Sequence, residues 1–320
     1  MSMPYGTISG LDRPVSRLVL GLGEATTADQ ALADALLDAF VAGGGTAVDT
    51  AAMYRDGESE RALGDWLRRR PEQRDLLVLT KGGYWRTGSP SRFTAAALTA
   101  DLEGSLRRLG RDRVAGYLLH LDDPAQPPDP LVDALHALRE RGRVGVAGAS
   151  NWTTARLDRA NAYAAARGYA PFAVSSLQLS LAVPREPMFP RTRSAAGDAA
   201  TLEWHRRRAT PLLAWSTQAN GFFATPSLDA APADPDVARV YDTPPNRERR
   251  RRAARLAAEL GCTPTQLALS WVLRQPDLNV FAAVGPRRLD ELRESLDATG
   301  IALSPAHRDW LDLGASPPPA

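Results

Sequence analysis

Lys81 is the only lysine in a chain that has 39 lysines and arginines in total. A lysine ammonium is a compact charge whose pKa shifts readily, whereas the arginine fork stays charged. Tyr54 beside this ammonium can act as a proton donor, because a positive charge stabilises the phenolate and lowers the phenol pKa from about 10. Asp49 would keep a desolvated Lys81 charged, and His120 can donate a hydrogen bond to a carbonyl oxygen. Together these residues are suited to protonating an alkoxide as it forms.

Each of these residues also has a structural interpretation when it is taken alone. An aspartate after a strand often caps a helix, a tyrosine often packs, and a lone histidine is usually a hydrogen-bonded structural residue. A bias toward arginine codons explains the arginines and leaves the single lysine to chance. The joint placement of the four residues in the predicted fold favours chemistry.

That fold is predicted from short apolar runs that alternate with segments of helical spacing. The alternation indicates parallel strands joined by right-handed crossovers, either closed into a barrel or open and doubly wound. The open alternative is weakened because Gly21-Leu22-Gly23-Glu24-Ala25-Thr26 has only the first two glycines of G-x-G-x-x-G. Eight units favour a closed (β/α)8 TIM barrel. The expected strands are 17–20, 46–49, 76–80, 116–119, 144–147, 174–178, 211–214 and 280–283, and the expected helices are 29–41, 59–69, 93–109, 131–141, 153–166, 199–208, 265–274 and 289–298.

In such a barrel the carboxyl ends of the strands converge on one mouth, where active sites lie. Asp49 ends the second predicted strand and Tyr54 follows it, while Lys81 and His120 follow the third and fourth. The sequence therefore predicts that these four side chains share a small volume.

Composition narrows the class of protein. The 320 residues are 44% hydrophobic and 24% charged, which excludes long disorder and transmembrane classes. A formal charge of +2 gives no global electrostatic case for nucleic acid or an anionic membrane. A single cysteine, Cys262, excludes an internal disulfide, and the start lacks a signal-peptide pattern, so a cytoplasmic protein is expected. No His, Cys and carboxylate set has metal-ligand spacing, so no metal is expected.

We expect one barrel domain over 1–320, with a long irregular loop at about 222–246 and a flexible tail from Pro317. A loop of that length usually acts as a lid or a binding loop, or is partly disordered. The arginine-rich run at 247–255 is interpreted as a solvated helix face rather than a nucleic-acid patch, because few aromatic residues are interleaved with it.

The order and spacing of the reactive residues resemble those of a known family. Asp49-Thr50-Ala51 with Tyr54, Lys81 in Leu79-Thr80-Lys81, and His120 in Leu119-His120 resemble, in order and spacing, the four catalytic residues of the aldo-keto reductase superfamily. Gly148-Ala149-Ser150-Asn151-Trp152 is similar to the family's G-x-S-N segment, and Gln178 and Trp215-Ser216 stand where the family has a glutamine and an aromatic–serine pair. The resemblance runs from about Val15 to Leu313.

The resemblance implies a nicotinamide cofactor that binds extended across the barrel mouth, hydride transfer to a carbonyl carbon, and proton delivery by Tyr54. It implies that Ser150, Asn151 and Gln178 bond the carboxamide, that Trp215 stacks on the ring, and that Ser216 touches the pyrophosphate. The full expected cofactor set is Gly23, Glu24, Asp49, Ser150, Asn151, Gln178, Trp215, Ser216, Thr217, Gln218, Asn220, Gly285, Arg287, Arg288, Glu291, Glu294 and Ser295.

Two segments depart from the family's pattern. The loop from Ser216 lacks the proline–leucine pair of many members, and Glu291 and Ser295 stand where an arginine or glutamine and an asparagine are usual. Arg287 and Arg288 still lie at a predicted helix start, which suits an anion. We therefore expect NADPH rather than NADH. The alternative is that both arginines are solvated and Glu291 repels a 2′-phosphate.

The predicted substrate pocket is largely aromatic and suits an apolar or ring-containing carbonyl compound. Its expected residues are Met53, Tyr84, Trp85, Trp152 and Phe222. The predicted function is an NADPH-dependent carbonyl reductase with a small-molecule carbonyl substrate and no nucleic-acid or membrane partner; oligomeric state is not predicted. Two alternatives stay open: a redox-sensing regulatory subunit, as in the potassium-channel β subunits of the same superfamily, and a barrel isomerase or lyase with a Schiff base on Lys81.

Overall fold

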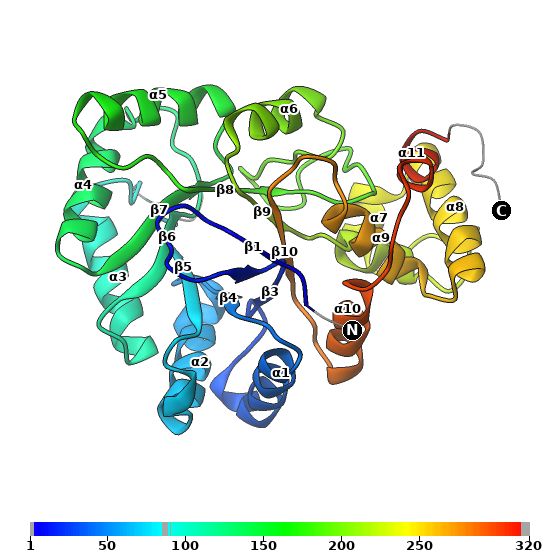
Figure 1. Ribbon diagram of the computed structural model, residues 1–320, viewed down its shortest axis with the longest axis horizontal. Coiled ribbons are helices and arrows are strands. Elements are labelled where there is room, and N and C mark those ends of the chain that lie inside the picture. Colours follow the sequence, from blue (N-terminus) through cyan, green and yellow to red (C-terminus); the bar gives the residue numbers. More distant parts are fainter. Residues whose placement is uncertain (1–2, 85–88, 90, 315–320) are drawn as a thin grey trace.

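The computed structural model describes residues 3–84, 89 and 91–314, and it is built around a closed barrel of parallel strands (Figure 1). The order around the barrel is β10-β3-β4-β5-β6-β7-β8-β9, so the predicted (β/α)8 TIM barrel is confirmed. The strands are β3 (Leu18–Gly21), β4 (Ala47–Asp49), β5 (Leu77–Gly82), β6 (Val114–Leu119), β7 (Val144–Ser150), β8 (Val174–Gln178), β9 (Leu212–Trp215) and β10 (Val280–Val284). Each expected strand matches one of these to within about three residues at either end.

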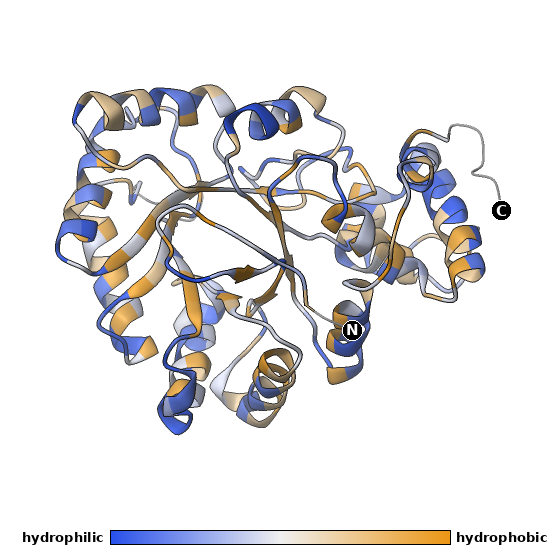
Figure 2. Ribbon diagram, in the orientation of Figure 1, coloured by the Kyte–Doolittle hydropathy of each residue, from blue (hydrophilic) through white to orange (hydrophobic). Residues whose placement is uncertain are grey.

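Helices surround the barrel and turn their apolar sides toward the strands (Figure 2). Side-chain caps start several of them: Thr94 accepts from the backbone N–H of Ala97, and Thr153 from that of Arg156. The helices that correspond to the expected ones are α1 (Gln30–Ala42), α2 (Glu58–Arg69), α3 (Ala95–Leu109), α4 (Asp129–Glu140), α5 (Thr154–Ala166), α6 (Ala199–Arg208), α9 (Pro264–Leu273) and, after the last strand, α10 (Leu289–Ala298). In the described part of the chain, no helix combines the length and the apolar character needed to cross a bilayer.

A hairpin that the sequence analysis missed lies before the barrel. It pairs β1 (Tyr5–Gly6) with β2 (Val15–Ser16) in antiparallel fashion. Ile8 and Val15 from this segment pack with Val19, Leu79 and other residues of the barrel interior. Strands of two residues leave no periodic pattern in the sequence, which is why the hairpin was not predicted.

The expected irregular loop at 222–246 is mostly structured, so that prediction was wrong over its second half. It contains α7 (Pro235–Tyr241) and the start of α8 (Pro244–Leu260). Asp234 and Thr243 cap these helices, and each is followed by proline at the first helical position. The prolines that suggested irregular backbone stand at the first position of a helix here. A backbone N–H at that position has no partner within the helix, so proline, which lacks one, is tolerated.

The arginine-rich run lies on α8, but it is more than a solvated face. Arg250 is fully buried; its Nη2 donates to the carbonyls of Leu228 and Ala230 at 2.7 and 2.8 Å, and its guanidinium lies 5.0 Å from the ring centre of Phe222. Arg252 donates to the Leu311 carbonyl at 2.9 Å, in the helix α11 (Pro305–Leu313). The run therefore ties α8 to the preceding loop and to α11. The predicted tail from Pro317 lies outside the described residues.

Candidate active site

Four reactive side chains meet at the carboxyl ends of β4, β5 and β6. Asp49 is the last residue of β4, and Tyr54 begins the short helix η2 (Tyr54–Gly57) after it. Lys81 lies in β5, while His120 follows β6. Side chains alternate along β5, so Thr80 turns outward to Glu60 on α2 and Lys81 turns inward to Asp49.

Lys81 bonds directly to the other members of the site. Its Nζ lies 2.6 Å from both carboxylate oxygens of Asp49, 3.1 Å from the Thr50 carbonyl and 3.3 Å from the Tyr54 hydroxyl. Lys81 and Asp49 are only 3% and 6% exposed. The His120 ring meets the Tyr54 ring edge-on, with centres 5.5 Å apart. The predicted proximity of the four residues is therefore observed.

The charge on Lys81 is maintained by its partners. Burial lowers the pKa of Lys81, but the charge and hydrogen bonds of Asp49, together with Tyr54, outweigh burial and leave that pKa above its usual value. A lysine that stays protonated is a poor nucleophile, which disfavours the Schiff-base alternative.

The pKa of Tyr54 shifts in the direction opposite to the predicted one. Burial raises the pKa of the Tyr54 phenol, Lys81 opposes this and Asp49 adds to it, and the net direction is upward. The sequence analysis considered the Lys81 ammonium but not the loss of solvation on burial. The prediction of a lowered Tyr54 pKa was therefore wrong. The phenol consequently keeps its proton at neutral pH.

His120 is held in its neutral form. Burial, and secondarily the charge of Lys81, places the pKa of His120 well below its usual value. Its Nδ1 is buried and has no hydrogen-bond partner among the described residues. The neutral ring therefore retains hydrogen-bonding capacity that its own chain does not use.

The residues expected at the carboxamide lie at the ends of β7 and β8 and are buried. Asn151 donates to the His120 carbonyl at 3.0 Å and accepts from the Arg193 N–H at 3.1 Å. Gln178 donates to Ser180 at 2.8 Å and accepts from the Ser194 hydroxyl. Ser150 accepts from Asn151 at 3.0 Å. The segment at 193–194, which no sequence pattern singled out, thus orients both amides.

The loop after β9 follows an unusual backbone path. Ser216 and Asn220 have φ values of 49° and 52°, in the left-handed region. Thr217 directs its hydroxyl to the Ala283 carbonyl at 3.0 Å, and Gln218 donates to Ser295 at 3.2 Å. Trp215 is half-buried, and its indole N–H has no partner among the described residues. This loop therefore bridges β9 to β10 and α10.

The start of α10 carries the arginines expected at the cofactor phosphate. Arg288 pairs with Asp290 at 3.0 Å and with Glu291 at 2.9 Å, and Glu291 also accepts from the Arg287 backbone N–H at 2.7 Å. The Arg287 side chain is exposed and has no ion pair within the described ranges. Glu294 accepts from the Thr263 hydroxyl.

Glycines leave bare backbone where β3 meets β10. A Cβ on Gly21 would lie 3.2 Å from the Val284 carbonyl, whereas one on Gly23 would meet nothing within 4 Å and one on Gly285 only the Gly21 carbonyl at 3.9 Å. Glu24 forms an ion pair with Arg55 beside this seam. An extended ligand could approach the backbone closely here.

The expected substrate residues divide into three groups. Tyr84 is half-buried with its ring 5.7 Å from that of His120, and half-buried Met53 immediately precedes Tyr54. Trp85 lies outside the described residues. The prediction that Trp152 and Phe222 line the substrate pocket was wrong.

Both of those rings belong to the packing. Trp152 is 1% exposed, donates its indole N–H to the Leu121 carbonyl at 3.0 Å and packs on Phe172. Phe222 is fully buried against Phe223 and Tyr241. The sequence analysis instead missed Phe189, which is 53% exposed with its ring 6.3 Å from that of Trp215.

Comparison with known proteins identifies the family of the chain. The sequence profile described as "Aldo/keto reductase family" matches residues 17–312. A putative aryl-alcohol dehydrogenase of Saccharomyces cerevisiae is 26% identical over 87% of this chain and 75% of its own length. An uncharacterized oxidoreductase of Bacillus subtilis is also 26% identical, over 94% of this chain and 92% of its own length. Norsolorinic acid reductase of Aspergillus flavus is 25% identical over 86% of this chain and 69% of its own length.

Solved structures agree at the level of the fold. The glycerol dehydrogenase of Gluconobacter oxydans superposes with a TM-score of 0.79 at 24% identity, covering 100% of this chain and 98% of that one. A thermostable aldo-keto reductase in complex with the inhibitor epalrestat gives a TM-score of 0.75 at 23% identity, covering 97% and 99%. The match of the family profile over almost the whole chain, joined to the barrel and its reactive cluster, leads to one conclusion: the chain belongs to the aldo/keto reductase family and is an NAD(P)H-dependent oxidoreductase.

Proposed function

We propose that this protein reduces an apolar, ring-containing aldehyde or ketone with NADPH, and that Tyr54 delivers the proton. The observation that carries the proposal is the pair of contacts that Lys81 Nζ makes, with the Tyr54 hydroxyl at 3.3 Å and with the buried Asp49 carboxylate at 2.6 Å. It joins a phenol that holds its proton to an ammonium that stabilises the phenolate once the proton has left.

Each residue then has a distinct task. Tyr54 passes its proton to the carbonyl oxygen as negative charge develops there, and Lys81 stabilises the resulting phenolate. Asp49 holds Lys81 charged and in place. His120, held neutral by burial, bonds the carbonyl oxygen and orients it. A bound nicotinamide supplies the hydride for the carbonyl carbon.

The residues present fit a nicotinamide dinucleotide. Ser150, Asn151 and Gln178 offer a hydroxyl and two amides at the mouth, and Trp215 offers a half-buried ring. The glycine seam between β3 and β10 admits close approach to the backbone, and α10 begins beside uncommitted Arg287. These groups would hold the carboxamide, ring and phosphates respectively.

NADPH is favoured over NADH because two guanidinium groups stand at the start of α10. A 2′-phosphate would compete with Glu291 for Arg288, whereas Arg287 is free of ion pairs with described residues. Dissociation constants of both cofactors test this preference. Arg287→Gln should weaken the binding of NADPH and leave the binding of NADH unchanged. Glu291→Gln should strengthen the binding of NADPH. Tighter binding of NADH by the unaltered protein would contradict the preference.

The substrate class follows from the apolar rings near the site. Tyr84 lies beside His120, and Phe189 lies beside Trp215. Three of the relatives are named aryl-alcohol dehydrogenases, which is consistent with an aryl aldehyde.

Steady-state NADPH oxidation at 340 nm with aryl and alkyl aldehydes, with alcohol identified as the product, tests the function. We expect turnover with a preference for the aryl compounds. Tight cofactor binding with rates near zero across the panel would overturn the proposal and favour the redox-sensing subunit.

A further inference from the structure

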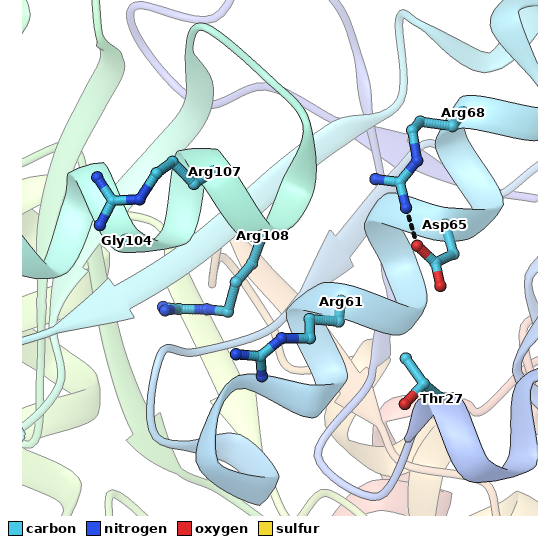
Figure 3. A pocket seen from close by; sticks show the side chains of 7 residues that line it. All are labelled: Thr27, Arg61, Asp65, Arg68, Gly104, Arg107 and Arg108. Carbon is cyan, nitrogen blue, oxygen red and sulfur yellow. Dashed lines mark hydrogen bonds and ion pairs between the residues drawn. The ribbon is translucent and has the colours of Figure 1, made fainter.

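The outer surface between α2 and α3 has a hollow of about 490 Å³ (Figure 3). Four arginines and one aspartate supply the charge of its wall. Such a volume is within the range of about 300–1,000 Å³ typical of small-molecule sites. The lining residues are Thr27, Arg61, Asp65, Arg68, Gly104, Arg107 and Arg108.

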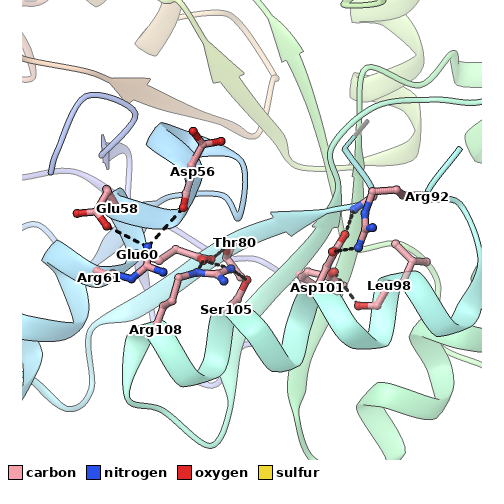
Figure 4. A network of polar contacts seen from close by, with 12 residues as sticks. Asp56, Glu58, Glu60, Arg61, Thr80, Arg92, Leu98, Asp101, Ser105 and Arg108 are labelled. Atoms are coloured by element: carbon pink, nitrogen blue, oxygen red, sulfur yellow. Dashed lines mark hydrogen bonds and ion pairs between the residues drawn. The ribbon is translucent and has the colours of Figure 1, made fainter. Parts of the chain in front are cut away.

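Arg108 is held in place by a buried network (Figure 4). Its Nε donates to Glu60 at 2.7 Å and its Nη2 to Ser105 at 3.3 Å. Glu60 is fully buried, and its other oxygen accepts from Thr80 at 2.5 Å. These hydrogen bonds hold the Arg108 guanidinium in place at the wall of the hollow, where its side chain is 22% exposed.

A glycine opens the space beside Arg108. A Cβ on Gly104 would lie 3.1 Å from Arg108 Nη1. Glycine inside a helix costs roughly 1 kcal/mol relative to alanine, so this position trades helix stability for room next to the guanidinium. Nη1 has no hydrogen-bond partner among the described residues.

The other arginines keep donors available. Arg107 is exposed and has neither an ion pair nor a side-chain hydrogen bond with any residue that the structure describes. Arg61 pairs with Glu58 at 3.0 Å and Arg68 pairs with Asp65, yet their side chains remain 48% and 57% exposed. A guanidinium has five N–H donors, so one carboxylate partner does not exhaust it.

We propose that this hollow binds a small molecule that carries two or more phosphate groups. Arginine matches phosphate oxygens with paired, charge-assisted hydrogen bonds. The guanidinium groups come from two facing helices, and the space exceeds what one inorganic phosphate fills, so a ligand with two or more linked phosphates can contact both walls. The proposal does not depend on the reaction at the barrel mouth.

A second hollow provides a comparison within the same protein. It measures about 330 Å³, lies between α3 and α4, and is lined mainly by alanine and leucine, with Glu103 and Arg141 as its charged residues. One acid balances one base there, so that hollow has no preference for anions. Arg141 is also exposed and supplies a matched charge-removal control.

Calorimetric titration of the full chain with inorganic pyrophosphate at low ionic strength tests the proposal. We expect binding that Arg107→Gln weakens by roughly tenfold or more, the loss expected for a hydrogen bond to a charged group. The double variant Arg61→Gln/Arg107→Gln should abolish it. Arg141→Gln, which removes the same charge, should leave the affinity unchanged, and thermal melting should show that every variant folds.

Three results would overturn the proposal. The first is no pyrophosphate binding at millimolar concentration. The second is equal weakening by Arg107→Gln and Arg141→Gln, which would mean general attraction to a basic surface. The third is weakening by Arg287→Gln alone, which would assign the binding to the barrel mouth.

Discussion

The two halves of the barrel mouth are built differently. At the ends of β4 and β5 the reactive side chains bond one another directly, as Lys81 does with Asp49 at 2.6 Å and with Tyr54 at 3.3 Å. At the ends of β8 and β9 the polar side chains are oriented by loops and helices. Gln178 bonds Ser194, and Gln218 bonds Ser295. One half is an internally bonded cluster, and the other depends on its surroundings.

Under the proposed function, this difference separates the residues that carry out the reaction from those that bind the cofactor. In the β4–β5 cluster the reactive side chains hold one another in place through direct contacts, so the cluster is preorganised for the transition state. The β8–β10 half instead depends on contacts with the segments at 193–194 and 216–224. Substitutions in the first half should therefore change kcat, whereas those in the second should change cofactor affinity.

Tyr54→Phe is expected to produce the largest effect. It removes the proton donor and leaves the ring in place, so kcat should fall by about 10³, within the range of general acid catalysis. Cofactor affinity should stay within about twofold, because the ring remains in place. Tyr163→Phe is the control, since that hydroxyl bonds Asp133 on an outer helix. A variant that kept most of its carbonyl reduction would assign the proton to another group.

Lys81→Arg is expected to lower kcat by about 10². The arginine keeps the charge, but a planar fork cannot occupy the place of a point charge that bonds two carboxylate oxygens, a carbonyl and a phenol in a site 3% exposed. Stopped-flow measurement of the reduction step, with circular dichroism to verify folding, checks this. If the Lys81→Arg variant were fully active, the reaction would not require a lysine at position 81.

The same contrast explains what could be predicted from sequence. Lys81 and Asp49 follow apolar runs of strand period, and barrel geometry alone sends such residues to one mouth. Phe189 and Ser194 lie on a loop whose path is set by tertiary contacts, such as the Arg193 N–H on Asn151. No periodic pattern encodes such a path, so those residues were missed.

Direction and environment were harder to predict than position. Trp152 follows Asn151, whose φ of 65° belongs to the left-handed region, and its indole lies buried on Phe172 rather than at the mouth. The pKa of Tyr54 was predicted from one neighbouring charge, whereas its direction depends first on burial. Neither the backbone turn nor the loss of water is visible in residue order.

Trp215→Leu tests the second half of the comparison and should act on cofactor affinity. Loss of a stacked ring should raise the cofactor dissociation constant by roughly tenfold, equivalent to about 1.4 kcal/mol. Saturated kcat should change little. Phe189→Leu is the matched substitution, and it should raise the KM for aldehyde instead. If Trp215→Leu lowered kcat and left cofactor affinity intact, the division between the two halves would fail.

The last expected effect concerns the pH dependence of stability and depends on His120. Its folded pKa lies well below the unfolded value of about 6.5, so the unfolded chain binds the additional proton first as pH falls. Stability from this group is therefore present above about pH 6.5 and decreases below it, by at most about 1.4 kcal/mol per pH unit. His120→Gln removes that dependence, so its melting temperature should fall less between pH 7 and pH 5 than that of the unaltered protein. His205, whose pKa is also lowered by burial, is present in both proteins and cancels from the difference. Parallel melting curves would show that His120 takes up its proton equally in the folded and unfolded chains, and the neutral ring proposed at the mouth would then be wrong.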